Sequence, residues 1–228
     1  MAFFIICMGK LMDWMIRRGL TDYREALTIM ESRVEEIISQ KQNETIWLLE
    51  HPDVYTAGTS ANFKDLKEPN KFPVYTTNRG GQFTYHGPGQ RIVYLMIDLE
   101  RFDLDIRKYV YFLEELVIKT LSDLSIPSRR WKDAIGVWID KNTDYNLEQN
   151  LHRYKIASIG VRVRRRIAFH GIAINISPNI QNFEGIVPCG IQDVKITSIF
   201  EQGIEISLTE FDQILKYNFD KLLNKRVE

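Results

Sequence analysis

The stretch Arg79–Gln90, RGGQFTYHGPGQ, is the part of the chain least like an ordinary helix or strand. Glycine allows positive φ angles and close approach of other groups, and Pro88 fixes φ and removes a backbone donor. Arg79 and His86 alternate with these residues, so polar side chains lie on a backbone that a ligand can approach. A plain surface turn is the simpler interpretation of one glycine-rich loop, and the rest of the chain has to decide.

Strands are predicted on both sides of this segment. Val74–Thr77 is a brief apolar run before it, and Arg91–Leu99 (RIVYLMIDL) is a longer run after it. Val54–Phe72 is irregular and polar, and we expect a loop with a short helical turn there. The glycine-rich segment is therefore predicted to connect two strands of a rigid sheet.

In the rest of the chain, predicted helices alternate with further predicted strands. Apolar residues three and four apart predict helices over 22–40, with Thr21 as N-cap, over 106–124, and after a capping box formed by Ser207 and Glu210. Further strands are expected over 45–49, 134–139, 155–163 and 167–176, the last two as a hairpin. Helices beside a mixed, mostly antiparallel sheet predict an α+β fold, in one domain over 1–228.

Composition excludes several classes of protein. The 228 residues carry 30 Lys plus Arg against 30 Asp plus Glu, and this balance argues against nucleic-acid binding. No apolar run is long enough to span a bilayer, so we expect no membrane association. The two cysteines, Cys7 and Cys189, form no disulfide framework and fit a reducing compartment. Residues 1–15 are expected to be an N-terminal extension, and Asp140–Arg153 a polar insertion.

Cys189 and Lys155 are candidates for covalent chemistry. Cys189 follows a proline and precedes a glycine in a loop, where an exposed thiol beside a cation would be nucleophilic. An inert, half-buried thiol is equally compatible with this spacing. Lys155 begins a strand whose same-face neighbours are apolar, so it would stabilise a thiolate if the strand end opens on a cleft. A lysine that only extends its ammonium to solvent is the simpler alternative.

The histidines and arginines are less specific. His170 lies in a strand and is by default a core residue, although Gly171 suggests a bulge or a close backbone approach. His86 is the better candidate for a site, whereas His51 and His152 are expected to be structural or exposed. No histidine pair has metal-ligand spacing, and we expect no metal site. Arg162 and 164–166 form a basic cluster that is either a solvated hairpin tip or a docking patch for an acidic protein.

Together these segments resemble the lipoyl/octanoyl transferases, which move an octanoyl group from acyl carrier protein to a lysine of a lipoyl domain. Three motifs match in order: Arg79–Gln90 (RGGQFTYHGPGQ), Lys155–Gly160 with His170–Asn175 (KIASIG and HGIAIN), and Pro188–Ser198 (PCGIQDVKITS). The combination is highly specific and the resemblance covers roughly residues 20–200. The departures, the N-terminal extension and the insertion, touch none of these motifs.

The resemblance implies a fold like that of the biotin/lipoate protein ligases. It also implies that Cys189 is the acyl-thioester nucleophile and that Lys155 favours its thiolate form. The implied substrate-binding residues are Arg79, Gly80, Gly81, Gln82, Phe83, Thr84, Tyr85, His86, Ser158, Ile159, Gly160, His170, Gly171 and Ile172. The implied partners are acyl carrier protein and the lipoyl domains of 2-oxoacid dehydrogenase complexes and of the glycine cleavage H protein, in the cytoplasm.

The implied reaction needs neither ATP nor a metal cofactor, because one thioester is exchanged for another before an amine attacks. Backbone N–H groups near Gly190 or in the glycine-rich loop are candidates for binding the oxyanion, and Lys155 is a candidate for the base. Two alternatives stay open: an ATP-dependent lipoate or biotin ligase that needs no thiol, and a non-catalytic module that docks acidic proteins through 162–166.

Overall fold

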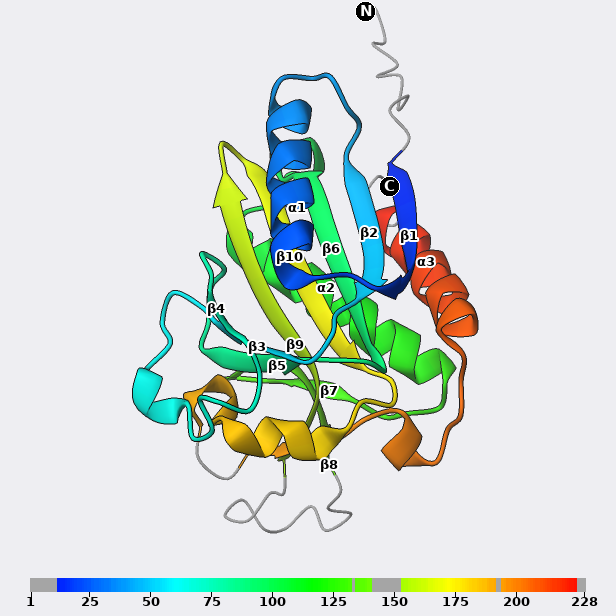
Figure 1. Ribbon diagram of the computed structural model, residues 1–228. Coiled ribbons are helices and arrows are strands. Elements are labelled where there is room, and N and C mark those ends of the chain that lie inside the picture. Colours follow the sequence, from blue (N-terminus) through cyan, green and yellow to red (C-terminus); the bar gives the residue numbers. More distant parts are fainter. Residues whose placement is uncertain (1–11, 133, 141–152, 192–193, 225–228) are drawn as a thin grey trace, which may run out of the picture.

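The computed structural model describes residues 12–132, 134–140, 153–191 and 194–224. A main sheet has the strand order β1-β2-β6-β10-β9-β8-β7, with β11 paired to β9, and a small sheet with the order β4-β3-β5 lies beside it (Figure 1). In the main sheet only the β1–β2 and β9–β11 pairs are parallel. The predicted α+β class with a mostly antiparallel sheet is confirmed. Among the described helices, none is long and apolar enough to cross a bilayer.

The elements have the following bounds. The strands are β1 (Asp13–Leu20), β2 (Thr45–Glu50), β3 (Val54–Ala57), β4 (Val74–Thr76), β5 (Phe83–His86), β6 (Gln90–Asp98), β7 (Arg129–Trp131), β8 (Ala134–Asp140), β9 (Arg153–Arg164), β10 (Ile167–Asn175) and β11 (Lys195–Ile196). The α-helices are α1 (Tyr23–Ile38), α2 (Ile106–Asp123) and α3 (Leu208–Asn224). Short 3-10 turns are η1 (Phe63–Asp65), η2 (Glu100–Phe102), η3 (Ile180–Gly185), η4 (Pro188–Gly190) and η5 (Phe200–Gln202).

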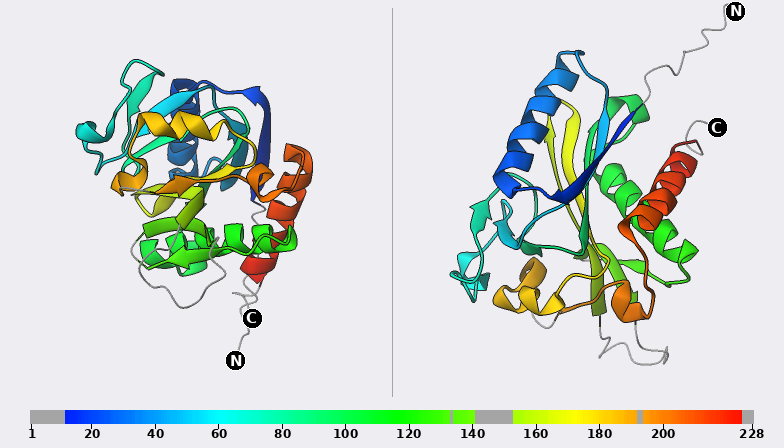
Figure 2. Two further views of the ribbon diagram at one scale, coloured as in Figure 1. Left: turned by 90° about the horizontal axis from the view of Figure 1, so that it is seen from below. Right: turned by 45° about the vertical axis from the view of Figure 1, so that its right-hand side comes forward.

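Helices cover both faces of the main sheet: α1 on one face, α2 and α3 on the other (Figure 2). On the α1 face, Met30 and Val34 pack against Trp47 and Phe169. On the other face, the apolar sides of α2 and α3 pack against the sheet in a second, larger cluster. Every residue of β6 and β10 is buried, since these central strands are covered on both sides.

The three predicted helices are confirmed, with one correction at the first cap. Asp22, not Thr21, is the N-cap of α1: its carboxylate accepts from the N–H groups of Arg24 and Glu25 at 2.9 and 3.0 Å. Thr21 instead donates its N–H to the carbonyl of Glu50 at 2.8 Å. It continues the pairing beyond β1, and its hydroxyl makes no hydrogen bond to the helix.

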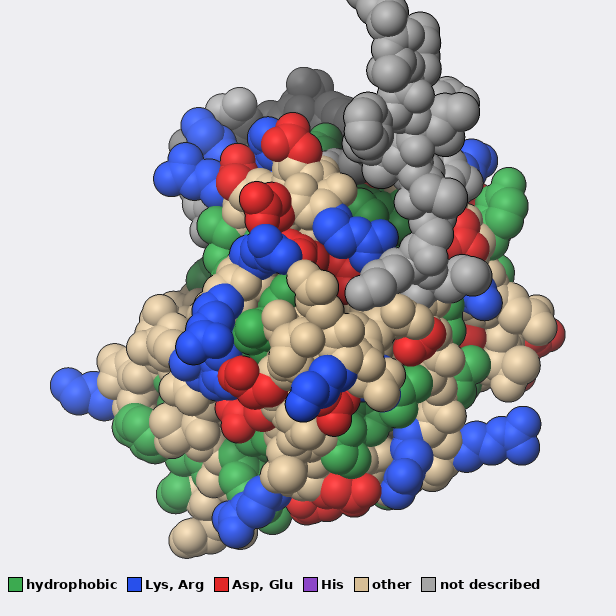
Figure 3. Space-filling view, turned by 90° about the horizontal axis from the view of Figure 1, so that it is seen from above, with side chains coloured by type: hydrophobic (Ala, Val, Ile, Leu, Met, Phe, Trp, Pro, Cys, Tyr) green, Lys and Arg blue, Asp and Glu red, His purple; other side chains and the backbone are tan. Residues whose placement is uncertain are grey.

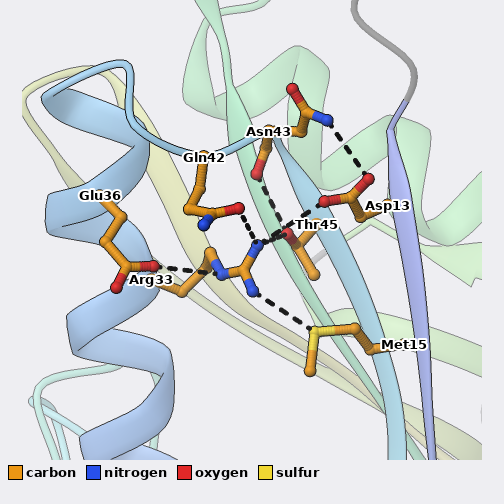
Figure 4. A network of polar contacts seen from close by, with 7 residues as sticks. All are labelled: Asp13, Met15, Arg33, Glu36, Gln42, Asn43 and Thr45. Carbon is orange, nitrogen blue, oxygen red and sulfur yellow. Dashed lines mark hydrogen bonds and ion pairs between the residues drawn. The ribbon is translucent and has the colours of Figure 1, made fainter.

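Strand β1 was missed from the sequence, and its first three residues, Asp13–Met15, lie in the expected extension 1–15. Asp13–Met15 pair in register with β2, so the part of 1–15 that the structure describes from Asp13 onward belongs to the sheet. Arg33 of α1 helps to hold this edge: it lies 3.7 Å from the Asp13 carboxylate and donates to Thr45 Oγ1 at 3.2 Å (Figure 4). The two strands are thereby tied to the helix that covers them.

The small sheet is the second departure from the sequence prediction. The expected loop at 54–72 contains β3, and the glycine-rich segment contains β5, which pairs with β3 antiparallel. The pair is only four residues long, too short for an alternation to stand out. The predicted helical turn in this region is η1. The expected insertion 140–153 lies almost entirely outside the described residues.

Candidate active site

Lys155 and Cys189 meet near the start of β9. Lys155 Nζ donates to Cys189 Sγ at 2.8 Å and to the carbonyl oxygen of Ile135 at 2.8 Å. Lys155 is only 3% exposed. A buried ammonium needs polar partners, and the sulfur and this carbonyl provide them. The contact places the lysine nitrogen directly beside the sulfur.

The turn that carries Cys189 has an unusual backbone. Cys189 has φ 61 and ψ 10, in the left-handed region, and Gly190 follows with φ 64. For a residue with a side chain this conformation costs about 1–2 kcal/mol. The turn is anchored on the small-sheet side, where Val187 donates its N–H to the carbonyl of Asp65 at 2.7 Å. Strain of this kind is typical of functional positions.

The glycine-rich segment closes around the buried guanidinium of Arg79. The guanidinium donates to the carbonyl oxygens of Gly80 and Gln82 and to both the carbonyl and the hydroxyl of Thr56, at 2.7–3.1 Å. Burial lowers the pKa of Arg79 from its usual range, and no ion pair joins it to a carboxylate of the described residues. Gly160 is needed opposite, since a Cβ there would lie 3.0 Å from Arg79 Cδ.

A cavity of about 320 Å³ opens beside the sulfur. Its lining joins the glycine-rich segment, α2, β8, β9 and the cysteine turn. The lining residues are Arg79, Gly80, Gly81, Gln82, Phe83, Val110, Ala134, Ile135, Lys155, Ser158, Ile159, Gly160, Val161, Cys189 and Ile191. The space is mostly apolar and ends at a thiol, so it suits an acyl chain with a reactive carbonyl at one end.

A second, smaller cavity of about 40 Å³ also borders Arg79; we call it the inner cavity, and the cavity beside the sulfur the outer cavity. It is lined by Tyr23, Arg79, Thr84, His86, Ile92, Tyr94, Ser158, Ile159, Gly160, His170, Gly171, Ile172 and Ala173. The two cavities share Arg79 and 158–160. Of the predicted substrate-binding residues, all except Tyr85 line one or both cavities.

Tyr85 points the other way. Its ring is fully buried in the core of the small sheet, and its hydroxyl donates to Asp53 Oδ1 at 2.5 Å. Thr84 and His86 face the inner cavity instead, since successive side chains of a strand alternate between its faces. Side chains of β5 therefore lie on both of its faces, and Tyr85 packs in the core of the small sheet.

The histidines beside the inner cavity are neutral. Burial lowers the pKa of His170 to about 3 and that of His51 to about 4, and it also holds the pKa of His86 well below its usual value. His51 donates from Nδ1 to the carbonyl of Thr21 at 2.7 Å, so its Nε2 accepts from the Tyr94 hydroxyl at 2.8 Å. His51 is structural, as expected, and His152 lies outside the described residues.

His170 has φ +62, yet the pairing of β10 keeps one register on both sides. The expected bulge is therefore absent in this described strand, and the alternative, a close backbone approach at Gly171, is confirmed. A Cβ at Gly171 would lie 2.2 Å from the carbonyl oxygen of Val93.

The sequence interpretation missed Tyr23, Tyr94, Val110 and Ile135 as lining residues. Each lies in a segment where the helical or strand pattern already explains an apolar or aromatic residue at that position. For Tyr94 the one available signal in the sequence was its hydroxyl within the apolar run of β6, because a buried tyrosine hydroxyl needs a hydrogen-bond partner.

The end of the arginine cluster, 164–166, lies away from Lys155, whereas Arg162 directly follows Val161, which lines the larger cavity. Along β9, nine residues separate Lys155 from Arg164, which corresponds to roughly 30 Å. Arg164 pairs with Glu35 at 2.8 Å, and Arg166 with Glu100 at 2.6 Å. The face seen in Figure 3 carries Lys and Arg side chains intermixed with Asp and Glu side chains. These arginines therefore do not form a uniformly basic docking face.

The described residues contain no group of three His, Cys, Asp or Glu side chains arranged to hold a metal ion. The titratable groups of the site are instead the thiol, the lysine, the Arg79 guanidinium, neutral histidines and tyrosines. Such a set can form and hold a thioester and can move a proton at the lysine.

Comparison with known proteins identifies the class. The model of the lipoyl protein ligase A/B catalytic domain matches residues 22–220, and the chain belongs to this family. An octanoyltransferase of Bartonella henselae is 44% identical over 217 residues, covering 95% of this chain and 89% of that protein. An octanoyltransferase of Cereibacter sphaeroides is 46% identical, covering 91% and 95%. The predicted family and acyltransferase class are confirmed.

Solved structures confirm the predicted fold. The bipartite lipoate protein ligase of Thermoplasma acidophilum has a TM-score of 0.67 at 14% identity, covering 94% of this chain and 85% of that one. The biotin protein ligase of Aquifex aeolicus in complex with biotin and ATP has a TM-score of 0.55 at 14% identity, covering 93% and 71%. At these identities the likeness concerns the fold alone.

Proposed function

We propose that this chain is an octanoyltransferase of lipoate biosynthesis that carries the acyl group on Cys189 as a thioester. The observation that carries the proposal is the 2.8 Å contact between Lys155 Nζ and Cys189 Sγ at a cavity of about 320 Å³. Octanoyl transfer, predicted from the motifs, is also the activity in the name of the relatives.

In the first half-reaction the Cys189 thiolate attacks the thioester carbonyl of the donor. The carrier's sulfur leaves and takes a proton from the Lys155 ammonium, which becomes a neutral amine. The new thioester has about the same energy as the old one, so the step needs no ATP or metal. Val110, Ile135 and Ile159 line the cavity that would receive the chain.

In the second half-reaction the acceptor amine attacks the acyl-Cys189 carbonyl. Lys155, now neutral, accepts the proton from the attacking nitrogen, and the Cys189 thiolate leaves as the amide forms. The ammonium–thiolate pair is thereby regenerated, and the amide product makes the step strongly downhill.

The proposed donors for the oxyanion change in the light of the geometry. The N–H of Gly190 donates to the Val187 carbonyl at 3.2 Å, and the N–H of Gly80 to that of Val161 at 3.0 Å. Both are occupied in this conformation. We assign the Lys155 ammonium, which contacts the sulfur, as a donor to the oxyanion of the first half-reaction.

We further propose that acyl carrier protein is the donor. The proposed acceptors are the lipoyl domains of 2-oxoacid dehydrogenase complexes and of the glycine cleavage H protein. We also propose that the chain is a single catalytic domain that acts in the cytoplasm. The Thermoplasma neighbour comes from a study of that ligase and its E2 lipoyl domain, which supports an acceptor of this class.

Intact mass spectrometry after incubation with octanoyl-carrier protein, without ATP, tests the mechanism. We expect one octanoyl adduct on the wild-type chain and none on Cys189→Ala. An adduct that survives in Cys189→Ala would refute the covalent role. Transfer that requires ATP would instead favour a ligase. Carrier binding without any transfer in the wild-type chain would favour a docking module.

A further inference from the structure

The peptide group between Ile135 and Gly136 lies between Lys155 and a buried carboxylate. Its carbonyl oxygen accepts from Lys155 Nζ at 2.8 Å, and its N–H donates to Glu114 Oε1 at 3.0 Å. In a trans peptide these two groups point in opposite directions, and no cis peptide occurs in the described residues. Glu114, on α2, therefore reaches Lys155 through a single peptide group.

Glu114 is held in place by an ion pair and a hydrogen bond. It is 7% exposed, and Arg130 Nε lies 3.1 Å from its Oε2. The same guanidinium lies over the ring of Tyr111, 3.6 Å from its centre, and donates to Glu115 Oε2 at 2.7 Å. A buried carboxylate is tolerated when it is paired and hydrogen-bonded, and Glu114 has both kinds of partner.

The backbone at Gly136 leaves no room for a side chain. A Cβ at this position would lie 2.6 Å from both the carbonyl oxygen of Ala157 and Lys155 Cε, and φ is +128. The pairing of β8 with β9 changes register directly afterwards, between Val137 and Trp138. The strand is thus bent so that this peptide faces the lysine.

We propose that Glu114 is a positioning residue for the Cys189–Lys155 pair, acting through the Ile135–Gly136 peptide. Hydrogen bonds in a chain polarise one another, so the carboxylate makes the Ile135 carbonyl a stronger acceptor. That carbonyl holds the Lys155 ammonium against the sulfur. The proposal rests on the function proposed above for Cys189 and Lys155.

Glu114→Gln tests it, with Glu115→Gln as the matched control. Glu115 is the next residue of α2 and binds the same arginine but does not contact the peptide. The readout is the pH dependence of iodoacetamide alkylation, quantified on the Cys189 peptide so that Cys7 does not contribute. In Glu114→Gln we expect the half-maximal pH to rise by about 0.5–1 unit and the rate at pH 7 to fall about 3–10-fold. Glu115→Gln should follow the wild-type profile.

A Glu114→Gln profile that superimposes on the wild type overturns the proposal, as does an equal shift in Glu115→Gln. Glu114→Asp provides a second variant if Glu114→Gln does not fold. It keeps the charge but is one methylene shorter, and a smaller shift in the same direction is expected; no shift overturns the proposal. Alkylation uses no acyl substrate, so this result is independent of whether Cys189→Ala abolishes transfer.

Discussion

The two cavities that meet at Arg79 differ in charge. At the outer cavity, a half-buried thiol on a strained turn contacts a buried lysine. At the inner cavity, apart from the shared Arg79 guanidinium, the titratable groups are histidines whose burial keeps them neutral near pH 7, beside tyrosine hydroxyls. The thiol and the lysine thus lie at the outer cavity alone, and Arg79 is the charged group that the inner cavity shares with it.

The largest effect is expected from removing the charge at the outer end. Lys155→Met keeps the apolar stem but leaves Cys189 without its cation, and we expect octanoyl transfer to fall by about 10²–10⁴-fold. Lys195→Met, on the adjacent strand β11, serves as control and should stay near the wild-type rate. Steady-state transfer assays measure both, and a Lys155→Met enzyme within tenfold of wild type would contradict the assigned role.

At the inner end, packing is expected to matter more than charge. Gly171→Ala places a Cβ 2.2 Å from the Val93 carbonyl oxygen, and we expect the free energy of unfolding to fall by about 1–3 kcal/mol. Gly203→Ala is the control, because it also has positive φ but nothing within 4 Å. Urea denaturation compares them, and equal losses would show that the close approach is unimportant.

The neutral histidines predict acid sensitivity. Their folded-state pKa values lie below the unfolded value near 6.5, so the unfolded state binds more protons as the pH falls. The free energy of unfolding should therefore decrease from about pH 6.5 down to about pH 4 for His51 and pH 3 for His170. The slope should be at most about 1.4 kcal/mol per pH unit for each histidine.

Urea denaturation at pH 7, 6 and 5 measures this slope. His51→Gln should reduce it by the share of one histidine. Stability that stays constant between pH 6.5 and 5 would mean that these rings are protonated in the folded protein.

The smallest effect is expected at the hairpin tip between β9 and β10. Charge reversal at Arg165, roughly 30 Å along β9 from Lys155, should change transfer by less than about twofold even at low salt, where exposed charges act over the longest range. Transfer rates at low and high salt check this. A large, salt-dependent loss would revive the docking patch considered from the sequence and would extend the functional surface far beyond both cavities.

The sequence was most informative where chemistry restricts residue choice. The glycines of 79–90, the loop cysteine and the lysine on an apolar strand all occupy positions that ordinary packing does not favour, and the three motifs together predicted the family. It was least informative where pairing depends on distant partners. Strand β1 forms because β2 offers a free edge and Arg33 joins both to α1, and β3 is recognisable only from its pairing with β5.

The amino-acid sequence by itself determined the α+β class, the three amphipathic helices and the family, and through the family resemblance it pointed to Cys189 and Lys155 as the pair proposed for the chemistry. The spacing of apolar residues, the residues that cap helices and the positions of glycine are local properties, and they can be recognised along one chain. Only the tertiary structure decided that Tyr85 faces away from the site, that the cavity divides at Arg79, and that Glu114 lies one peptide away from Lys155. These are contacts between segments far apart in the chain, and such contacts arise only when the sheet and its covering helices have assembled.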